Sequence, residues 1–577
     1  MATAVRPSRA PRGAYTTSGL TKKQRYELLR GQLSLERSSF ISHWKDLNDY
    51  ILPRRGRFFV TDVNRGDRRS QHIIDSTATF AARTLQAGMM SGVTSPARRW
   101  FRLTTPDPEL AEQQDIKVWL DQVGQRMDTI FLRSNLYNAL PIIYGDLGVF
   151  GTAAMGVLED DETLIRCYPY PIGSYSIATD ARGQVRVFFR EFRMTVRQVV
   201  EQFGEDRITR ATAAKWKNAQ YETWVDVCHV ISPNQDYDSR KLSSQYKAFA
   251  SCYYEKGTSE DLYLEESGFD EFPVLVPRWE VTGEDTWATN CPGMTALGDI
   301  KQLQLGERRG MQAIEKMVSP PMNAPSAMRT AKASILSGDI NYLDVRDGMQ
   351  GFQPVYQIDP KINELEMKQQ QVRLRVQRAF FEDLFLMLAQ SDRREITARE
   401  IDERHEEKLL ALGPVLEQLN QDLLDPLIDR TFNIMVRKGL IPEPPQALEG
   451  VPLKVEYISI MAQAQKMVGL AGLERFAGFV GQMATIDPTV LDKVNRDEMV
   501  QDYGEMTGVP PKVIVSDDDV AQVRQARAAA AQKQKDAEAL SASADAAHKL
   551  SQADTTKPSL LTGLLSNAPS ALGGAAA

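Results

Sequence analysis

The sequence predicts an α+β fold that is mostly helical and spans several domains. Over long stretches the apolar residues recur every three or four positions, which is typical of amphipathic helices. Between residues 157 and 282, alternating and β-branched runs replace this pattern and indicate a strand-rich section. A chain of 577 residues has room for about four domains, and its 42% hydrophobic content is enough to give them buried cores.

Charge and cysteine content narrow the class of protein. The formal net charge is −7, which argues against a surface that binds nucleic acid throughout, because such surfaces are basic; a local basic site stays open. The four cysteines contain no CxxC pair, and the adjacent Cys228 and His229 would point to opposite faces of a strand. We therefore predict reduced thiols, no metal site and no cofactor. The sequence has no apolar run of the roughly 18 residues that would cross a membrane.

The N-terminal part combines a basic tail with helices. Residues 1–19 are predicted to be disordered, although their arginines and serines also resemble an organelle transit peptide. Thr21 is a candidate N-cap for a helix whose apolar face continues to Pro53. A second helix is expected over residues 73–90. The arginines between the two helices fit a solvated loop or a phosphate contact, and they are Arg54, Arg55 and Arg57.

Glycines mark the passage into the strand-rich section. A helical pattern covers residues 109–140, and four glycines follow within twelve residues. Their spacing fits neither of the common phosphate-binding glycine motifs, so we predict close backbone packing instead. Within the strand-rich section a short helix is expected over residues 195–203. The four glycines are Gly145, Gly148, Gly151 and Gly156.

Two long helices are expected in the centre of the chain. The first covers residues 292–318, with Thr295 as its cap and Pro320 and Pro321 as its stop. The second covers residues 361–388 and would be about 42 Å long, at about 1.5 Å per residue.

A polar break and a kinked helix follow the second long helix. Residues 389–395 are polar and interrupt the helical pattern, which then resumes and continues to Val436. Gly413 and Pro414 lie inside the resumed pattern. Because a proline removes an amide donor and clashes with the preceding turn, we predict a kink there. Pro426 is a second site where the same helix can bend.

The C-terminal part is predicted to be helical. A helical pattern covers residues 456–508, and Asp517, Asp518 and Asp519 suit the N-terminus of a further helix. From Ala521 on, the chain is rich in alanine, with strong helix propensity but a poor apolar stripe. Such a helix is marginal alone, so it either packs against copies of itself or frays. The last twenty residues are predicted to be disordered.

The motifs of several enzyme classes are missing from the sequence. It contains no Walker A motif, no HExxH, no GxSxG and no paired cysteines of the zinc type. The acidic run over residues 402–407 alternates with Arg and Lys, as on a salt-bridged helix face. We therefore predict a structural protein without catalytic residues.

Four stretches of the chain resemble one known family in their order and spacing. They are LQAGMMSGVTSPARRWFRL (85–103), PGMTALGDIK (292–301) with 315–316 and 320–321, ITAREI (396–401) with EEK (406–408), and LGPVL (412–416) with LDPLIDR (424–430). Over about residues 20–520 the sequence resembles the head-to-tail connector, or portal, proteins of short-tailed double-stranded DNA phages, the podoviruses.

The resemblance implies a portal-type fold assembled as a ring of twelve subunits around a DNA channel. The fold would have a β-rich wing, long stem helices, a clip and a helical crown. By position the segments are a disordered N-terminal tail (1–19), the wing (20–290), the first stem helix (291–319), the clip (320–359), the second stem helix (360–388), the tunnel loop (389–396), the kinked wing helix (397–440), the crown (441–520), and an alanine-rich helix with a disordered tail (521–577).

The resemblance also implies which residues lie in the channel. Asp392, Arg393, Arg394 and Glu395 would belong to the tunnel loop that narrows it, and the two arginines either contact DNA or pair with the two acids. The predicted kink would let the chain turn from the lumen to the wing. Five polar residues recur along the second stem helix and would face either the lumen or the next subunit, and they are Glu364, Lys368, Gln371, Arg375 and Arg378.

The resemblance to ring-shaped portal proteins also implies a set of binding partners. They are further copies of the chain, double-stranded DNA, a packaging ATPase (the terminase large subunit), a tail adaptor, and capsid and scaffolding proteins, with no membrane. The clip is the candidate docking surface for the ATPase and the adaptor. The protein would serve genome packaging, retention and ejection at the portal vertex of the virion, after assembly in the host cytoplasm.

The net charge and the missing enzyme motifs help to choose between the portal interpretation and its alternatives. Twelve copies would carry a formal charge of 12 × −7 = −84, and such an acidic ring repels the DNA backbone and lets it slide. The alternative interpretation is a pore-less scaffold or adaptor protein of the virion. A packaging motor is a further rival, and the missing Walker A motif argues against it.

Overall fold

The computed structural model describes residues 20–62, 66–107, 110, 113–323, 353–354, 362–390, 412–448, 453–458, 475–484, 487–495, 498–500, 503 and 517–551. The chain divides into two compact units, residues 1–494 and 495–577. Helices and strands both contribute to the first unit, which confirms the predicted α+β class. The predicted N-terminal tail, the charged centre of the tunnel loop and most of the predicted clip lie outside the described residues.

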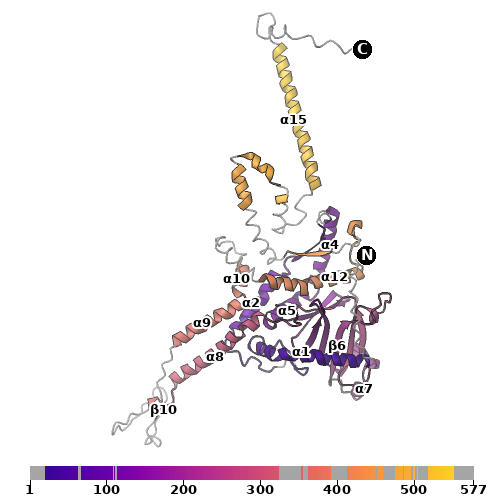
Figure 1. The fold of residues 1–577 in the computed structure, drawn as a ribbon, viewed down its shortest axis with the longest axis vertical. Helices are drawn as coiled ribbons and strands as arrows, with labels where there is room; N and C mark the ends of the chain where they lie inside the picture. The colour runs from indigo at the N-terminus through magenta and orange to yellow at the C-terminus, as the bar shows by residue number, and fades with distance from the viewer. Residues whose placement is uncertain are drawn as a thin grey trace, which may run out of the picture. The chain divides into compact units, whose positions relative to one another are not determined.

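Helix α1 (Lys22–Tyr50) begins at the predicted cap. The Thr21 hydroxyl accepts a hydrogen bond from the Gln24 amide at 3.3 Å, and the Gln24 side chain accepts one from the Thr21 amide at 3.0 Å. This capping box satisfies two amides that the start of a helix leaves free. The helix ends before Pro53, as predicted. It lies against one face of the largest sheet (Figure 1), where Leu33 is buried among sheet residues.

The largest sheet confirms the predicted strand-rich section. Its five strands are antiparallel in the order β4-β5-β6-β7-β8. The short helix predicted over residues 195–203 is α6 (Val196–Phe203), capped by Thr195 at the end of β5, and α7 (Arg210–Lys217) follows. These helices cover one end of the face opposite α1, through a cluster that includes Val199 and Val227. The strands are β4 (Tyr175–Thr179), β5 (Val185–Thr195), β6 (Trp224–Pro233), β7 (Phe249–Glu255) and β8 (Glu265–Phe269).

Three helices between residues 77 and 150 contribute buried residues to the main core. The stretch predicted to be helical over residues 109–140 forms two helices, with a break between them at Ser134 and Asn135. The break occurs because the Asn135 side chain exchanges two hydrogen bonds of 2.7 Å with the backbone of Cys167. The second helix continues further than predicted. The expected helix over 73–90 begins later, at Thr77. The helices are α2 (Thr77–Gly92), α4 (Gln114–Arg133) and α5 (Leu136–Phe150).

The glycines after residue 140 pack closely, as predicted. Gly148 lies in α5, where an added Cβ would sit 2.1 Å from the Leu85 side chain of α2. Any larger residue at this position would therefore require the Leu85 side chain to shift. Gly151 ends α5 with a φ of +80°, a conformation that favours glycine.

Two smaller sheets complete the described strands of the wing. β2 (Ala154–Asp160) pairs with β3 (Leu164–Tyr170) and with β9 (Val274–Leu275). β1 (Phe101–Thr104) pairs antiparallel with β12 (Lys454–Tyr457).

The pairing of β12 corrects the helical pattern predicted over residues 456–508. A helical pattern was expected from residue 456, yet Glu456 and Tyr457 lie in a strand of the first unit. The reason is tertiary, because the Tyr457 ring stacks on Trp100 at 6.5 Å beside the partner strand. Among the described residues that follow, 475–484 are helical and 488–493 form a 3-10 helix.

Helix α8 (Pro292–Val318) matches the first long helix, but its predicted cap is wrong. Cys291 caps it instead of Thr295, with the Cys291 sulfur accepting a hydrogen bond from the Met294 amide at 3.4 Å. Pro292 occupies the first helical position, where its fixed φ suits the helix and its missing N–H costs nothing. Thr295 therefore lies inside the first turn.

The second long helix is interrupted, so the prediction of one helix over residues 361–388 is wrong. Phe380 is fully buried, and Phe381 has a φ of +56°, which is uncommon for a bulky residue. The Phe381 ring lies 6.2 Å from that of Trp279 in the wing. Packing of these phenylalanines against the wing outweighs the hydrogen bonds of a continuous helix. The two helices are α9 (Ile362–Ala379) and α10 (Glu382–Gln390).

The kink at Gly413 and Pro414 stays a prediction. Both residues lie in the first described turn of a helix that the structure shows from Leu412 on, and the residues immediately before Leu412 are outside the described part.

An irregular turn occurs further along this helix. Asn420–Leu424 is π-helical and leads into α12 (Asp425–Arg437). The Asp425 amide bonds to the Asn420 carbonyl, five residues back. Since Pro426 has no N–H to donate to the preceding turn, the wider π turn accommodates it.

The second unit contains helix α15 (Asp517–Ser551), which begins at the predicted acidic residues. Carboxylates at a helix N-terminus interact favourably with its dipole. Nearly all of its described side chains are exposed. Among the helices that the structure describes, none is long and apolar enough to cross a membrane.

Candidate functional site

Helices α8 and α9 form an antiparallel hairpin. β10 (Met322–Asn323) and β11 (Gln353–Pro354) pair antiparallel beyond their adjoining ends. Figure 1 shows the two helices side by side with β10 at one end. A Cβ added at Gly310 of α8 would lie 3.3 Å from the Leu365 side chain of α9, so a small residue keeps the helices close.

Arg373 of α9 ties the hairpin to the wing. It donates hydrogen bonds to Asp75 at 2.9 Å and to Glu307 of α8 at 2.6 Å. Burial raises the pKa of Asp75, but hydrogen bonds from Thr77 and the pairing with Arg373 outweigh it, so the pKa is lowered. The carboxylate therefore stays charged at neutral pH and holds the arginine in place.

The five predicted stem residues are all exposed on α9. They follow one another by steps of four and three, so they share one side of the helix. Arg375 pairs with Asp299 of α8 at 2.7 Å, within the same chain. Whether the five residues face the lumen or the next subunit stays a prediction, and they are Glu364, Lys368, Gln371, Arg375 and Arg378.

The predicted tunnel-loop residues cannot be placed. Asp392, Arg393, Arg394 and Glu395 lie outside the described residues. The described chain before them ends with α10, whose Phe385 packs on α2: a Cβ added at Gly88 would lie 2.1 Å from its ring. Helix α10, which precedes the predicted loop, is therefore packed on the main core.

The arginine cluster after Pro53 has a structural role that sequence reasoning missed. Arg55 is paired with the buried Asp146 of α5 through hydrogen bonds of 2.6 Å and 2.5 Å. Arg57 donates to the Asp62 carbonyl at 2.7 Å. Both alternatives predicted for these arginines, a solvated loop and a phosphate contact, are therefore wrong for Arg55. The sequence offers no signal that Asp146, in the middle of an apolar helix, is its partner.

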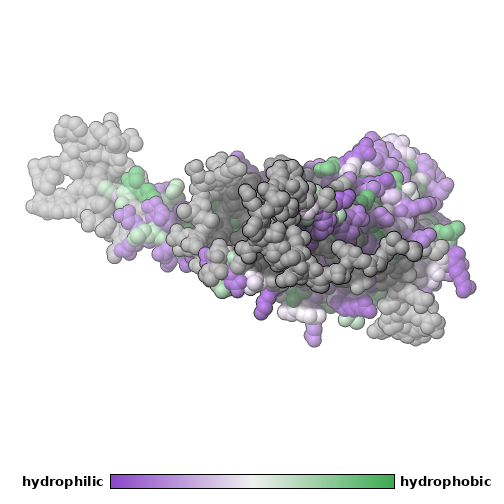
Figure 2. Space-filling view, turned by 90° about the horizontal axis from the view of Figure 1, so that it is seen from above, coloured by the Kyte–Doolittle hydropathy of each residue, from purple (hydrophilic) through white to green (hydrophobic). Residues whose placement is uncertain are grey.

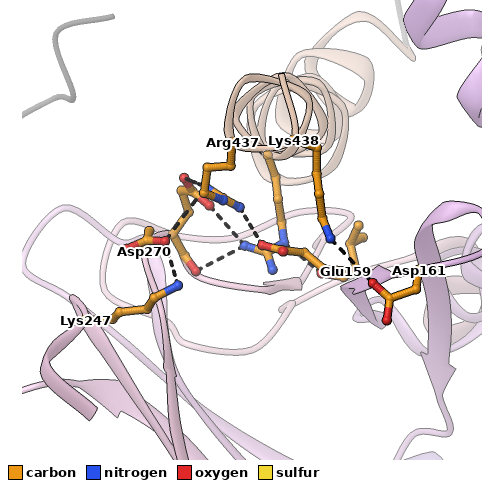
Figure 3. A network of polar contacts seen from close by, with 9 residues as sticks. Glu159, Asp161, Lys247, Asp270, Arg437 and Lys438 are labelled. Atoms are coloured by element: carbon orange, nitrogen blue, oxygen red, sulfur yellow. Dashed lines mark hydrogen bonds and ion pairs between the residues drawn. The ribbon is translucent and has the colours of Figure 1, made fainter. Parts of the chain in front are cut away.

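A network of charged residues holds the end of α12 on the wing (Figure 3). Arg437 forms ion pairs with Glu159 at 2.7 Å and with Glu271 at 2.8 Å. Lys438 pairs with Asp161 at 3.4 Å. These cations lie at the helix C-terminus, where positive charge is favoured. That position was the one signal in the sequence that could have indicated the network.

Two buried arginines hold α12 and the π turn before it against other parts of the first unit. Arg430 donates to the Val157 carbonyl at 2.7 Å and pairs with Glu271 at 3.2 Å, while burial lowers its pKa to about 10. Arg278 pairs with Asp422 of the π turn at 3.1 Å. Both contacts join segments far apart in the sequence, so periodicity could not reveal them.

The cysteines are all free and buried. Burial raises the pKa of each thiol to about 12, so the reactive thiolate is disfavoured at neutral pH. Across the described part of the chain, no group of three or more His, Cys, Asp and Glu residues could hold a metal ion.

The chain belongs to the bacteriophage head to tail connecting protein family, whose model matches residues 23–515. It is 48% identical over 544 residues to the "Portal protein" of Salmonella phage epsilon15, which covers 94% of this chain and 98% of that relative. It is 43% identical over 532 residues to the "Probable portal protein" of Bordetella phage BPP-1, covering 92% of this chain and 96% of the relative.

Family membership confirms two predictions. The resemblance to phage head-to-tail connectors is confirmed over nearly the whole chain. The prediction of a structural protein that is not an enzyme agrees with a family of portal and connecting proteins.

Proposed function

We propose that this chain is the subunit of a ring that surrounds a DNA channel at one vertex of the capsid. The observation that carries the proposal is the α8–α9 hairpin in a chain of the connector family. Its longer helix, with 27 residues, spans about 40 Å at 1.5 Å per residue. A long, closely packed hairpin is a suitable wall for a channel that must admit a DNA duplex.

Exposed apolar residues support assembly through the hairpin. Large exposed hydrophobic surfaces mark interaction sites in soluble proteins. The left side of Figure 2, where Figure 1 places the hairpin, shows hydrophobic residues among hydrophilic ones. We assign them to contacts between neighbouring subunits of a closed ring, for which the resemblance suggests twelve copies. They are Leu305, Met311, Ile314 and Met317 of α8, and Met367 and Leu374 of α9.

The proposed segments keep their predicted order with two changes. The second stem helix is α9, and α10 is a separate helix that packs on the wing. The wing also includes β12, so the crown begins after residue 458. The clip between α8 and α9, the tunnel loop and the kinked wing helix stay as predicted from the sequence.

The proposed ring passes DNA in both directions. It would nucleate procapsid assembly with scaffolding and capsid proteins, dock the packaging ATPase at the clip, and later hold the tail adaptor there. Its acidic charge keeps the DNA backbone from binding tightly, because few phosphates are neutralised. Arg393 and Arg394 would add two local basic rings. In this proposal the ring assembles in the host cytoplasm and stays at the portal vertex of the virion.

Images of the purified protein test the proposal. We expect closed rings with a central hole in negative stain, and a particle mass of twelve times 64.7 kDa, or about 780 kDa. Rings with a different number of subunits would correct the expected count of twelve but would still support the proposed channel. Solid or open helical assemblies would favour a pore-less scaffold or adaptor and overturn the proposal.

A further inference from the structure

A cleft lies beside the end of α1, apart from the hairpin and from the charged network at α12. Its volume is about 340 Å³, which is within the range of pockets that hold small ligands. The last turns of α1 form one wall, through Lys45 and Asp49, and the segment between α1 and α2 forms the other, through Phe59, Arg68 and His72. The proposed channel uses none of these residues.

Contacts within the chain fix the shape of this cleft. Arg69 pairs with Asp62 at 2.6 Å, and the Asp62 amide donates to the Phe59 carbonyl at 2.9 Å. Nearer to α1, the Gly56 amide donates to the Asn48 side chain at 2.9 Å. The walls are therefore held in place by the chain itself, and a preorganised site binds a ligand with a smaller loss of entropy.

The lining of the cleft has an excess of positive charge. It holds three cations, Lys45, Arg68 and Arg69, against the two carboxylates of Asp49 and Asp62, although the whole chain has a net charge of −7. Arg69 and Asp62 neutralise each other. Among the residues that the structure describes, no carboxylate pairs with Lys45 or with Arg68. An anion with one negative charge balances the lining, whereas Asp49 repels a second charge.

An exposed aromatic ring accompanies the unpaired lysine. The Nζ of Lys45 lies 4.4 Å from the centre of the Phe59 ring, and 64% of Phe59 is exposed. Such a ring gains stability by stacking on another flat, apolar group. A ligand that uses both the ring and the cations is therefore an aromatic anion.

A nucleotide unit of a single strand combines the two required parts. Its base can stack on an aromatic side chain, and its phosphodiester carries one negative charge. A carboxylate side chain would use the cations and leave the Phe59 ring exposed. A duplex would offer its phosphates, but its bases are already stacked on one another.

We propose that this cleft binds one nucleotide unit of single-stranded nucleic acid. The base stacks on the exposed part of the Phe59 ring, and Lys45 and Arg68 contact the phosphodiester beside it. The proposal does not rest on the proposed channel, because the residues that line the cleft lie outside the hairpin.

Binding of a labelled oligonucleotide to the full chain tests the site. We expect fluorescence anisotropy to detect binding of a single strand of about eight nucleotides. Phe59→Ala should weaken this binding by about 5- to 150-fold, which corresponds to one stacked base. Arg68→Ala should lower the slope of log K against log salt by about 0.7, as for one lost phosphate contact. Both side chains are exposed, so neither change should unfold the chain.

The loop between β6 and β7 supplies matched controls. Lys241 lies 3.8 Å from the centre of the Tyr246 ring, so this loop has an equivalent cation and aromatic ring, yet neither residue lines the cleft. Lys241→Ala should leave the affinity and the salt slope unchanged. Tyr237→Ala, which removes an exposed ring from the same loop, should also have no effect.

Competition separates a nucleotide from other anions. An unlabelled single strand should displace the probe, whereas a duplex of the same sequence, an abasic strand and a glutamate-rich peptide should each compete at least about fivefold less well, because they lack an unpaired base. Equal competition by the duplex or the abasic strand would indicate a site for phosphates alone, and stronger competition by the peptide would indicate a site for carboxylates. Each of these results would overturn the proposal, as would no binding, or binding that Phe59→Ala leaves unchanged.

Discussion

Gly293 shows how one residue limits the fit between two helices. It lies in the first turn of α8, where an added Cβ would sit 2.3 Å from the backbone oxygen of Val149 in α5. Gly298, in the same helix, has nothing within 4 Å of such an atom. Backbone atoms cannot move aside as the end of a flexible side chain can, so the two positions should respond oppositely to alanine.

We expect Gly293→Ala to lower the free energy of unfolding by about 1–3 kcal/mol. Gly298→Ala should raise it by about 0.5–1 kcal/mol, because alanine favours the helix. Denaturant unfolding of the unassembled chain measures both. The packing argument fails if the two variants change stability by the same amount and in the same direction.

The stability of the wing helix should depend on the protonation of Asp429. Partial burial, and then the charges of Asp425 and Glu271, raise its pKa to about 6. An aspartate in an unfolded chain has a pKa of about 3.9, so folding favours the protonated form. The contribution to stability is fully present below about pH 4 and is lost as the pH rises through about 6.

Asp429→Asn removes this dependence, because an amide does not ionise in this range. We expect the variant to have a higher Tm than the unsubstituted chain at pH 8 and nearly the same Tm at pH 4. Thermal unfolding followed by fluorescence at the two pH values provides the comparison. A gain of equal size at both would assign the effect to packing and not to ionisation.

At the scale of elements, α9 and α10 show why a helical pattern does not establish one helix. Phe380, Phe381 and Phe385 fit the apolar periodicity of a continuous helix. In the structure they turn the chain onto the wing, with Phe380 fully buried and Phe385 against Gly88. Helix propensity favours continuity by less than about 1 kcal/mol per residue, whereas burying one phenylalanine contributes about 1.5–3 kcal/mol.

Helix α15 poses the opposite case, since it has strong helix propensity but a poor apolar stripe. Its described side chains are almost all exposed, and an isolated helix gains little without tertiary contacts. We expect a peptide of residues 517–551 to be partly helical, with circular dichroism that does not depend on peptide concentration. Cooperative melting that sharpens with concentration would show that copies of the helix pack together instead.

At the scale of the whole molecule, the proposed channel makes Arg393 and Arg394 its local basic site. Replacing both with alanine should leave ring assembly unchanged, because neither belongs to the hairpin or the wing sheet. Particles should then package or retain less DNA, since two rings of phosphate contacts are lost. DNA content per particle measures this, with Arg182→Ala, at an exposed turn of the wing, as the control.

The two arginines would have no role in DNA contact under one clear outcome. If the double variant packages, retains and ejects DNA like the unsubstituted chain, pairing with Asp392 and Glu395 becomes the better interpretation.

The sequence by itself determined the class of fold, the family and most helices and strands. These depend on local information: the Thr21 cap, the alternation in the strands, and the motifs spread over residues 85–430. It also indicated that the glycines near Gly148 pack closely. Such features could be predicted because each is set by residues a few positions apart.

Only the tertiary structure decided which distant segments meet. It paired β1 with β12, placed Arg278 on Asp422 and Arg55 on Asp146, and broke the second long helix at Phe381. None of these follows from periodicity, because burial and charge pairing depend on which chain segments are adjacent in space and not on their spacing in the sequence.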